Sequence, residues 1–508
     1  MVSGVLSPLG LREASAGGAE AGAVGVVAVG RGGAFVARAS DPTALGHNVA
    51  GIVGLAGVQW TLSANLGSWS HCFQRAGRYD GAESGVETRT TVFASSRYPE
   101  ARPGYPEVCN EPGTAVVPQV LVTWRPTPWL AFGAGILTPA GIGGQRFPDR
   151  VQTAAGLAPS PARYMVLSTG VVIIHPTLAV AVAPTPWLRL GAAVQPSYGR
   201  FRGETMANAI GSQSPATDVR TSLDATAFFW AANLGAMVQP HPGLTVGFHA
   251  HLNELPVVFQ GTSTATVRPY AADPAEMHRS TFQSEVTLPL PSLWRLGVRY
   301  AALRPGAPTD WSARDPMRDE AWDLELDLHY ENASTLQWVT TRNLGTVEVS
   351  PGMGSPATPE VALRRGWRDV WGVRFAAEGN VVANVLALRA GLSWDQGAQT
   401  GPRAIDGVQF GWNPDAGIDT AAYDTLGLSA GLSWRWRWLT VDLAYQHLFV
   451  GGQDVVRGRA TTVSGTVPIT AGDCARGPGY PGPGACTNNQ GSYRAAYDVV
   501  AVGITGRH

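Results

Sequence analysis

The sequence predicts an all-β fold, a transmembrane antiparallel β-barrel of about 14 strands. Three observations lead to it: sparse charge, apolar and polar residues that alternate along the chain, and a repeated turn motif. Charged residues make up 15% of the 508 residues, with 37 basic against 38 acidic side chains, whereas soluble proteins carry about 25%. Several soluble domains would need more surface charge. The balanced charge also disfavours nucleic acid as a partner.

A membrane protein can lack surface charge, but no stretch approaches the roughly 20 apolar residues of a spanning helix. The longest candidates, 21–29 and 171–174, are too short. A closed barrel is the other structure that satisfies its backbone hydrogen bonds in lipid. No basic-then-apolar leader follows Met1, so we expect that a leader was removed or that the start was assigned too late.

Alternation with a period of two is the main evidence for strands. Residues 426–438 place leucine, alanine or tryptophan at even positions and glycine, serine or arginine at odd positions. Residues 322–330 alternate in the same way, with acidic residues or histidine at the odd positions. A helix would mix the two sets, whereas a strand with unlike faces separates them.

A turn motif, Pro-Thr-Pro-Trp-Leu-x-x-Gly at 126–133, recurs at 184–191 and, as Pro-His-Pro-Gly-Leu-x-x-Gly, at 240–247. This spacing suits a strand, a long loop, a returning strand and a tight turn. Counting outward from these turns predicts 14 strands, near 52–68, 115–125, 129–139, 164–183, 187–203, 220–239, 243–264, 282–301, 321–339, 367–377, 384–395, 422–436, 438–450 and 494–506.

The two longest predicted loops, 69–114 and 451–493, contain the four cysteines. We predict two disulfides, Cys72–Cys109 and Cys474–Cys486, formed in an oxidising compartment. Neither pair has the CxxC spacing of a zinc site. Bacterial barrels place long loops outside and short turns in the periplasm, which predicts a multi-pass outer-membrane protein with extracellular disulfides. A β-propeller or an array of sandwiches is the alternative, and it would need a soluble surface.

The residues between the lipid-facing ones should line the lumen, where they form a neutral arc and a charged arc. The first strands turn small or neutral side chains inward. On later strands the inward side chains are charged, and positive and negative residues lie on adjoining strands. We interpret these residues as a cross-strand salt-bridge lattice that braces the barrel. The alternative is a polar channel wall or a headgroup site. The members of the lattice are Arg295, Arg299, Asp323, Glu325, Asp327, Arg374, Arg389, Arg435 and Arg437.

Metal or catalytic chemistry is not predicted. His249 and His251 share the inward face near Glu254, but a third well-placed ligand is not evident. We therefore expect hydrogen bonding in the lumen rather than a metal. The sequence contains neither a GxSxG elbow nor a glycine-rich loop between a strand and a long helix, so we expect no enzyme and no cofactor.

Two segments resemble the FadL family of outer-membrane transporters for long-chain fatty acids and other hydrophobic compounds. Residues 30–51 resemble its amino-terminal hatch, with Asp41 able to cap a short helix that Pro42 opens, and residues 133–144 resemble its third strand. Residues 288–291 and 322–330 also lie where the family has similar stretches. The chain departs from the family at Val49, where proline is usual, and at His508, where barrel proteins commonly end in an aromatic residue. The residues that carry the resemblance are Asp41, Pro42, Asn48, Ala50 and Gly51 in the hatch, and Pro139, Gly141, Gly143 and Gly144 in the strand.

The resemblance implies a barrel, 52–508, plugged by residues 1–51, with an apolar pocket and sideways release of substrate at a kinked third strand. Glycine and proline independently favour a bulge there; the alternative is a loop that simply starts at Pro139. The predicted function is passive uptake of a hydrophobic small molecule by a monomer in contact with outer-membrane lipid and lipopolysaccharide. A general diffusion porin with a charged constriction is the alternative. We choose the candidate pocket residues only by their inward positions in the alternating pattern, which we call parity. They are Leu121, Leu137, Val171, Ile173, Phe229 and Met237.

Overall fold

The computed structural model describes residues 23–76, 79, 104–111, 113–138, 144–153, 156–208, 215–254, 256–350, 353–356, 360–405, 407–418, 422–455 and 488–508. No helix in this part of the chain is long and apolar enough to cross a membrane.

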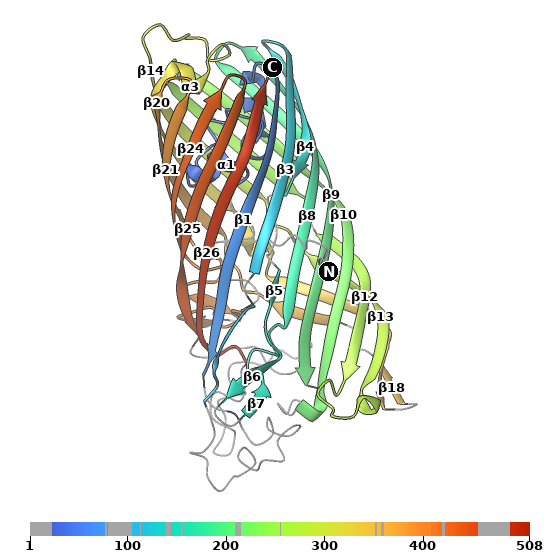
Figure 1. Ribbon diagram of the computed structural model, residues 1–508. Helices are drawn as coiled ribbons and strands as arrows, with labels where there is room; N and C mark the ends of the chain where they lie inside the picture. The colour runs from blue at the N-terminus through green and yellow to red at the C-terminus, as the bar shows by residue number, and fades with distance from the viewer. Residues whose placement is uncertain are drawn as a thin grey trace, which may run out of the picture.

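Fourteen antiparallel strands close into a barrel (Figure 1). β26 pairs with β1 over its whole length, from Arg507 opposite Gln59 to Gly491 opposite Arg75, and this pairing closes the sheet. Round the barrel the strands are β1 (Gly57–Arg75), β3 (Gly113–Thr127), β4 (Leu130–Leu137), β8 (Ser168–Thr185), β9 (Leu188–Asn208), β10 (Asp218–His241), β11 (Leu244–Asn253), β14 (Leu293–Leu303), β15 (Glu320–Glu331), β20 (Val370–Val382), β21 (Leu386–Asp395), β24 (Thr425–Trp436), β25 (Leu439–Val455) and β26 (Gly491–Arg507).

The number and order of these strands confirm the prediction, and two details differ from it. The first strand begins at Gly57 rather than at 52, because residues 49–54 form the 3-10 helix η1 (Val49–Gly54). Three predicted strands bend and continue as separate segments, and the strand predicted near 367–377 is preceded by a further segment outside its predicted range. These are β11 into β12 (Val257–Val267), β13 (His278–Leu288) into β14, β15 into β16 (Trp338–Leu344), and β19 (Glu360–Arg364) into β20.

The bends coincide with residues that interrupt a ladder. Pro256 lies between β11 and β12, and Pro289 and Pro291 lie between β13 and β14; proline lacks the N–H that a ladder requires. Gly366, between β19 and β20, has a φ of 57°, which favours glycine. Beyond the bends the pairing continues, from β12 through β13 and β16 to β19.

The remaining elements are short. The helices are α1 (Val26–Gly30), α2 (Ala44–His47), η3 (Pro215–Thr217), η4 (Pro274–Glu276), α3 (Pro316–Asp319) and η5 (Ala333–Thr335). The short strands are β2 (Glu107–Cys109), β5 (Gln145–Arg146), β6 (Arg150–Thr153), β7 (Gly156–Pro159), β17 (Thr346–Ser350), β18 (Met353–Pro356), β22 (Arg403–Ile405) and β23 (Val408–Phe410).

The two ends of the barrel differ. At the end we call the short-turn end, two or three residues join β3 to β4, β8 to β9, β10 to β11, β20 to β21 and β24 to β25. One connection at this end is longer, residues 304–319, and it contains α3. The carboxyl terminus lies at the same end, and β6 and β7 lie toward the opposite, long-loop end (Figure 1).

The outer face explains the low charge of the sequence. On β24, Leu426, Leu428 and Trp434 are exposed, whereas the alternate residues Ser433 and Arg435 are buried. β15 follows the same pattern. Tryptophans cluster outward beside the short turns, as expected of an aromatic girdle at a membrane interface; they include Trp124, Trp129, Trp187, Trp436 and Trp438.

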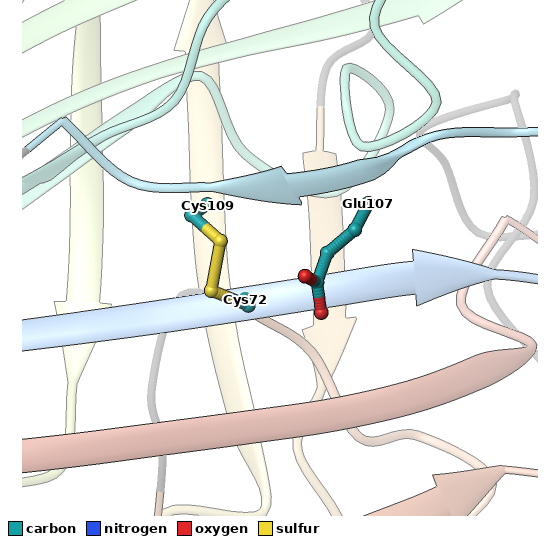
Figure 2. A group of neighbouring side chains, drawn as sticks. All are labelled: Cys72, Glu107 and Cys109. Carbon is teal, nitrogen blue, oxygen red and sulfur yellow. A yellow bond between two sulfur atoms is a disulfide. The ribbon is translucent and has the colours of Figure 1, made fainter.

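A disulfide joins Cys72 of β1 to Cys109 of β2 (Figure 2). The two cysteines lie directly opposite each other in the β1–β2 ladder, so the predicted pair is confirmed. The second predicted pair, Cys474 and Cys486, lies outside the described residues.

Leu326 lies midway between the outward aromatic residues Trp322 and Tyr330 of β15, so it should face the centre of the bilayer. We expect Leu326→Arg to lower the free energy of unfolding by about 2–4 kcal/mol. Val381→Arg is the matched control, because Val381 is 62% exposed next to the short turn after β20 and should cost about 0–1 kcal/mol at the interface. Denaturant titration in lipid vesicles measures both, and equal costs would contradict the assignment of the lipid face.

Candidate functional site

Residues 23–56, which we call the inner segment, lie inside the barrel. Nearly all of them are buried. At one end α1 contacts β24 and β25, and at the other end η1 contacts β8, β9 and β10. The segment therefore crosses the lumen from one wall to another.

Asp41 and Asn48 shape the inner segment locally. Asp41 Oδ1 accepts a hydrogen bond of 2.8 Å from the Thr43 N–H and closes a turn ahead of α2. The expectation that Asp41 caps a helix opened by Pro42 is wrong, because α2 begins at Ala44 with Thr43 as its N-cap. Asn48 Oδ1 accepts from the Ala50 N–H at 3.2 Å and thereby caps η1.

Asn48 also fixes the segment to the barrel wall. Its Nδ2 donates to the Val36 carbonyl at 2.9 Å and to the Ala236 carbonyl of β10 at 3.1 Å. Gly51 packs so closely on Ala39 that a Cβ would lie 2.4 Å from the Ala39 oxygen. Val49 takes the first position of η1, a position that proline also tolerates, so the departure from the family pattern leaves the cap intact.

Two carboxylates of β15 bind four consecutive backbone N–H groups of the inner segment. The N–H groups of residues 35 and 36 donate to Asp327 Oδ2 at 2.9 and 3.1 Å. Those of residues 37 and 38 donate to Glu325 Oε1 at 2.7 and 3.2 Å. A carboxylate is a strong acceptor for such groups, so β15 holds this part of the chain by its backbone.

Arg31 of the inner segment is fully buried among three carboxylates. Its guanidinium lies 2.7 Å from Asp323, 2.8 Å from Glu325 and 3.5 Å from Glu378. Arg38 pairs with Asp323 and, at 2.7 Å, with Glu378. We refer to Arg31, Arg38 and the acidic residues Asp323, Glu325, Asp327 and Glu378 as the anchor.

The predicted lumen lattice is therefore only partly cross-strand. Arg299 pairs with Asp323 of the adjoining strand at 3.0 Å and also with Glu320. Glu325 and Asp327, by contrast, are bound by the inner segment. Arg31 and Arg38 were not predicted as their partners, because sequence distance gives no sign of a contact between residue 31 and residue 323.

Among the other predicted members, Arg389 and Arg374 form cross-strand pairs between β20 and β21, as predicted. Arg374 lies opposite Asp327 in the ladder but pairs with Asp395 at 2.7 Å. Arg389 pairs with Glu378 at 3.0 Å, Arg435 pairs with Asp315 at 2.7 Å, and Arg295 donates to the Gly46 carbonyl at 3.2 Å.

Arg437 was predicted to line the lumen, and this is wrong. It occupies the turn between β24 and β25, where its φ is 56°, and its exposed guanidinium lies over the Trp436 ring. The strict alternation of the sequence continues past the last residue of the strand, so parity alone misplaces it.

The six predicted pocket residues are all buried, but they belong to two groups. Leu121, Leu137 and Met237 pack with Leu45 and Ile52 of the inner segment. These three predicted residues therefore contact the inner segment rather than an open pocket.

Val171, Ile173 and Phe229 belong to a second cluster, nearer the long-loop end, which we call the apolar wall. It includes Phe259, which is fully buried, and Trp367, which is 1% exposed; neither was predicted. The alternating pattern could have identified Phe259, because it occupies an inward position of a predicted strand. It could not have identified Trp367, because this residue lies at the bend between β19 and β20, where the alternation is interrupted. The other members larger than alanine are Val257, Val286, Leu288, Leu290, Leu336, Val339 and Val370.

A cavity of about 60 Å³ lies against the polar part of the lumen. Its lining includes His329, Arg374, Asp395 and Gln446, with His47 of the inner segment. The lumen thus has an apolar side formed mainly by β8, β10, β12 and β13 and a polar side formed by β14, β15, β20, β21 and β25.

The two inward histidines have different surroundings. His251 Nδ1 lies 2.7 Å from Asn233 Oδ1, which fits the expected hydrogen bonding. His249 is buried with no hydrogen-bond partner among the described residues, so the expectation is wrong for this residue, which lies opposite Arg295 in the ladder. Glu254 is exposed and accepts from the Trp230 N–H at 2.9 Å.

Within the described part of the chain, only Cys72, Glu107 and Cys109 bring three ligand-type side chains together (Figure 2). The two sulfur atoms are bonded to each other, and Glu107 pairs with Arg494. No thiolate is therefore available to a metal there.

The third barrel strand, β4, is shorter than its neighbours. It spans eight residues, and its pairing with β3 starts only at Val120. Among the described residues, none pairs on this side with residues 113–119 of β3 or 170–174 of β8. Pro139, Gly141 and Gly143 lie outside the described residues, while Gly144 directly precedes β5.

No protein-family model matches the sequence, and no curated protein matches it. Solved structures do match. A FadL homologue of Pseudomonas aeruginosa is 15% identical with a TM-score of 0.67, covering 96% of this chain and 99% of its own. The Pseudomonas putida toluene transporter TodX is 12% identical with a TM-score of 0.62, covering 96% and 99%. The Ralstonia pickettii toluene transporter TbuX is 14% identical with a TM-score of 0.58, covering 96% and 98%.

These likenesses span both chains almost completely, and they define the class of fold. The chain has the 14-stranded barrel fold of the FadL-type outer-membrane transporters.

Removing the charge of Arg31 should release the inner segment. Arg31→Met leaves three buried carboxylates short of one cation, and we expect a loss of about 3–5 kcal/mol in the stability of the docked segment. Conductance in planar bilayers should then rise. Arg200→Met is the control, because the Arg200–Asp224 pair is 43–46% exposed and such pairs contribute about 0–1 kcal/mol. Unchanged conductance and unchanged unfolding of Arg31→Met would contradict the role of the anchor.

Proposed function

We propose that the protein is a passive channel for hydrophobic small molecules, long-chain fatty acids or compounds of similar character, across a bacterial outer membrane. The observation that carries the proposal is the apolar wall inside a barrel whose lumen is crossed by the anchored inner segment. A water-filled porin would have a polar lumen instead. Structures of the same fold include a FadL homologue and toluene transporters. The channel would need neither an enzyme activity nor a cofactor.

The inner segment acts as a hatch in this proposal. It is held by buried charge pairs and backbone hydrogen bonds, so the axial path through the barrel is closed to solutes. This argues against a general diffusion porin, which requires an open lumen. The boundary between hatch and barrel falls at Gly57, where β1 begins.

Substrate would enter from the long-loop end, bind the apolar wall and leave sideways beside β4. The short length of β4 and the incomplete pairing of β3 and β8 among the described residues support this route. Val171 is a residue of β8, and it packs in the apolar wall with Phe229 of β10. An apolar ligand that leaves into lipid avoids water and keeps about 0.8 kcal/mol per buried CH₂.

The proposed orientation rests on the rule that bacterial barrels place short turns in the periplasm and long loops outside. The short-turn end would face the periplasm and the Cys72–Cys109 disulfide the cell exterior, with lipid and lipopolysaccharide around a monomeric barrel.

Uptake of a panel of fatty acids and aromatic hydrocarbons, in a host that lacks its own transporter, tests this function. We expect Phe259→Gln to lower uptake about tenfold, because an amide in the apolar wall costs roughly 1–3 kcal/mol when it has no partner. Phe282→Gln is the matched control, since Phe282 is also buried, on the adjacent strand β13, but packs in a different cluster. Equal uptake by both variants, or no uptake by the unmodified protein, would contradict the proposal.

The sideways route has its own test. Replacing Pro139, Gly141, Gly143 and Gly144 with threonine or valine, which favour regular strands, should abolish uptake while the heat-modified gel shift of a folded barrel is retained. Replacement of Gly411 with alanine controls for loss of glycine, because Gly411 lies in a connecting loop where an added Cβ would meet no atom within 4 Å. Uptake that persists through a folded variant would exclude release at this strand.

A further inference from the structure

A cavity of about 390 Å³ lies at the short-turn end, between the inner segment and residues 304–319. We call it the short-turn chamber. Leu55 of the inner segment, Met237 of β10 and Trp311 of the 304–319 connection supply apolar surface to its lining, beside several arginines. The chamber lies on the opposite side of the inner segment from the apolar wall, so it is not part of the proposed uptake pocket.

The 304–319 connection is fixed across the barrel end. Asp315 accepts from Arg435 at 2.7 Å and from Arg507 at 3.1 Å. Burial alone would raise the pKa of Asp315, but these two guanidinium groups hold it below its usual value. Arg314 also donates to the Pro242 carbonyl at 2.7 Å. The chamber therefore has a wall that is tied to β24, β26 and the turn after β10.

Three arginines that line the chamber have no carboxylate partner among the described residues. Arg125 donates to the Val53 and Ser312 carbonyls at 3.1 and 2.8 Å. Arg314 donates only to backbone carbonyls. The acidic side chains of the lining, Asp315 and Glu320, are already paired with other arginines.

Arg189 is the most informative of the three. It is 5% exposed, and its Nε and Nη2 atoms are buried without a hydrogen-bond partner in the described structure. Its guanidinium lies 3.7 Å from the centre of the Trp311 ring. Asp310, next to Trp311, accepts from Ser312 instead, at 2.8 and 2.7 Å. The Asp310 carboxylate therefore attracts Arg189 only across a longer distance, without an ion pair or a hydrogen bond between them in the described structure. A buried cation without such a direct partner is costly unless an anion joins it.

We propose that the short-turn chamber binds a small organic carboxylate that carries an apolar body. The carboxylate fits the paired donors of a guanidinium, and Arg125 and Arg314 add to the positive potential there. Leu55, Met237 and Trp311 then cover the apolar body. An inorganic anion would use the charges but not this apolar surface, and an uncharged aromatic would leave Arg189 without an anionic partner. The site does not depend on the uptake route.

Calorimetric titration of the full-length protein in detergent at low salt tests the site, with benzoate as the probe. We expect saturable binding that Arg189→Gln weakens at least tenfold. Arg437→Gln should change it less than twofold, because Arg437 is an exposed arginine of the same barrel end. Arg125→Gln, expected to weaken binding severalfold, is a second variant should Arg189→Gln lose the heat-modified gel shift of a folded barrel.

Two further probes distinguish the ligand class. Benzyl alcohol and inorganic phosphate should each bind at least tenfold more weakly than benzoate. If benzyl alcohol bound as tightly as benzoate, the arginines would not recognise a carboxylate. If phosphate bound more tightly than benzoate, the site would not select a ligand with an apolar body. Absence of saturable benzoate binding, or equal binding by the folded Arg189→Gln variant, would overturn the proposal, whatever the outcome of the uptake assays.

Discussion

The capture of the inner segment by the acidic residues of β15 is the interaction on which the rest of the lumen depends. Asp323, Glu325 and Asp327 occupy successive inward positions of one strand, so three carboxylates line up at strand spacing. Like charges this close would repel one another unless cations or N–H donors compensate them. Arg31, Arg38 and four backbone N–H groups supply that compensation. The acidic ladder thus requires the inner segment, and the segment requires the ladder to satisfy its own buried backbone.

This constraint divides the lumen. The charged residues of β15 and β20 hold the segment on one side, and its far end, η1, contacts β8, β9 and β10. Small residues there permit the contact, since a Cβ at Gly191 or Gly235 would collide with η1. Toward the long-loop end, β8 and β10 contribute Val171, Ile173 and Phe229 to the apolar wall. In the proposed function, the closed axial path and the apolar side wall would therefore be two results of one arrangement, and together they would favour a sideways route for an apolar ligand.

The sequence predicts the fold well because the period of two is a local property and because lipid allows few alternatives. All 14 strands follow from alternation and from a turn motif that repeats. Parity also places side chains inside or outside correctly for most of a strand, but it gives no height along the barrel axis. Leu121 and Phe229 are both inward, and only the structure separates the residue beneath the inner segment from the residue of the apolar wall. Partners such as Arg31 and Asp323 are equally hidden, because no local pattern links residues so distant in the chain.

The repeated turn motif reverses the chain and also places side chains in the short-turn chamber. Arg125 and Gln239 directly precede the copies of the motif at 126–133 and 240–247. Arg189 and Thr245 directly follow the leucine of the copies at 184–191 and 240–247. All four line the short-turn chamber, because equivalent positions of a repeated turn lie at the same height and on the same face of the barrel. Two of the four are arginines, and the connection that covers them contributes Trp311 and Arg314 rather than a carboxylate in contact with Arg189. The positive chamber thus arises from the placement of arginine at repeat-equivalent positions, whereas the negative ladder of β15 is compensated from within the chain. An anion from outside the chain is the remaining partner that would complete the charge pairing of this barrel end.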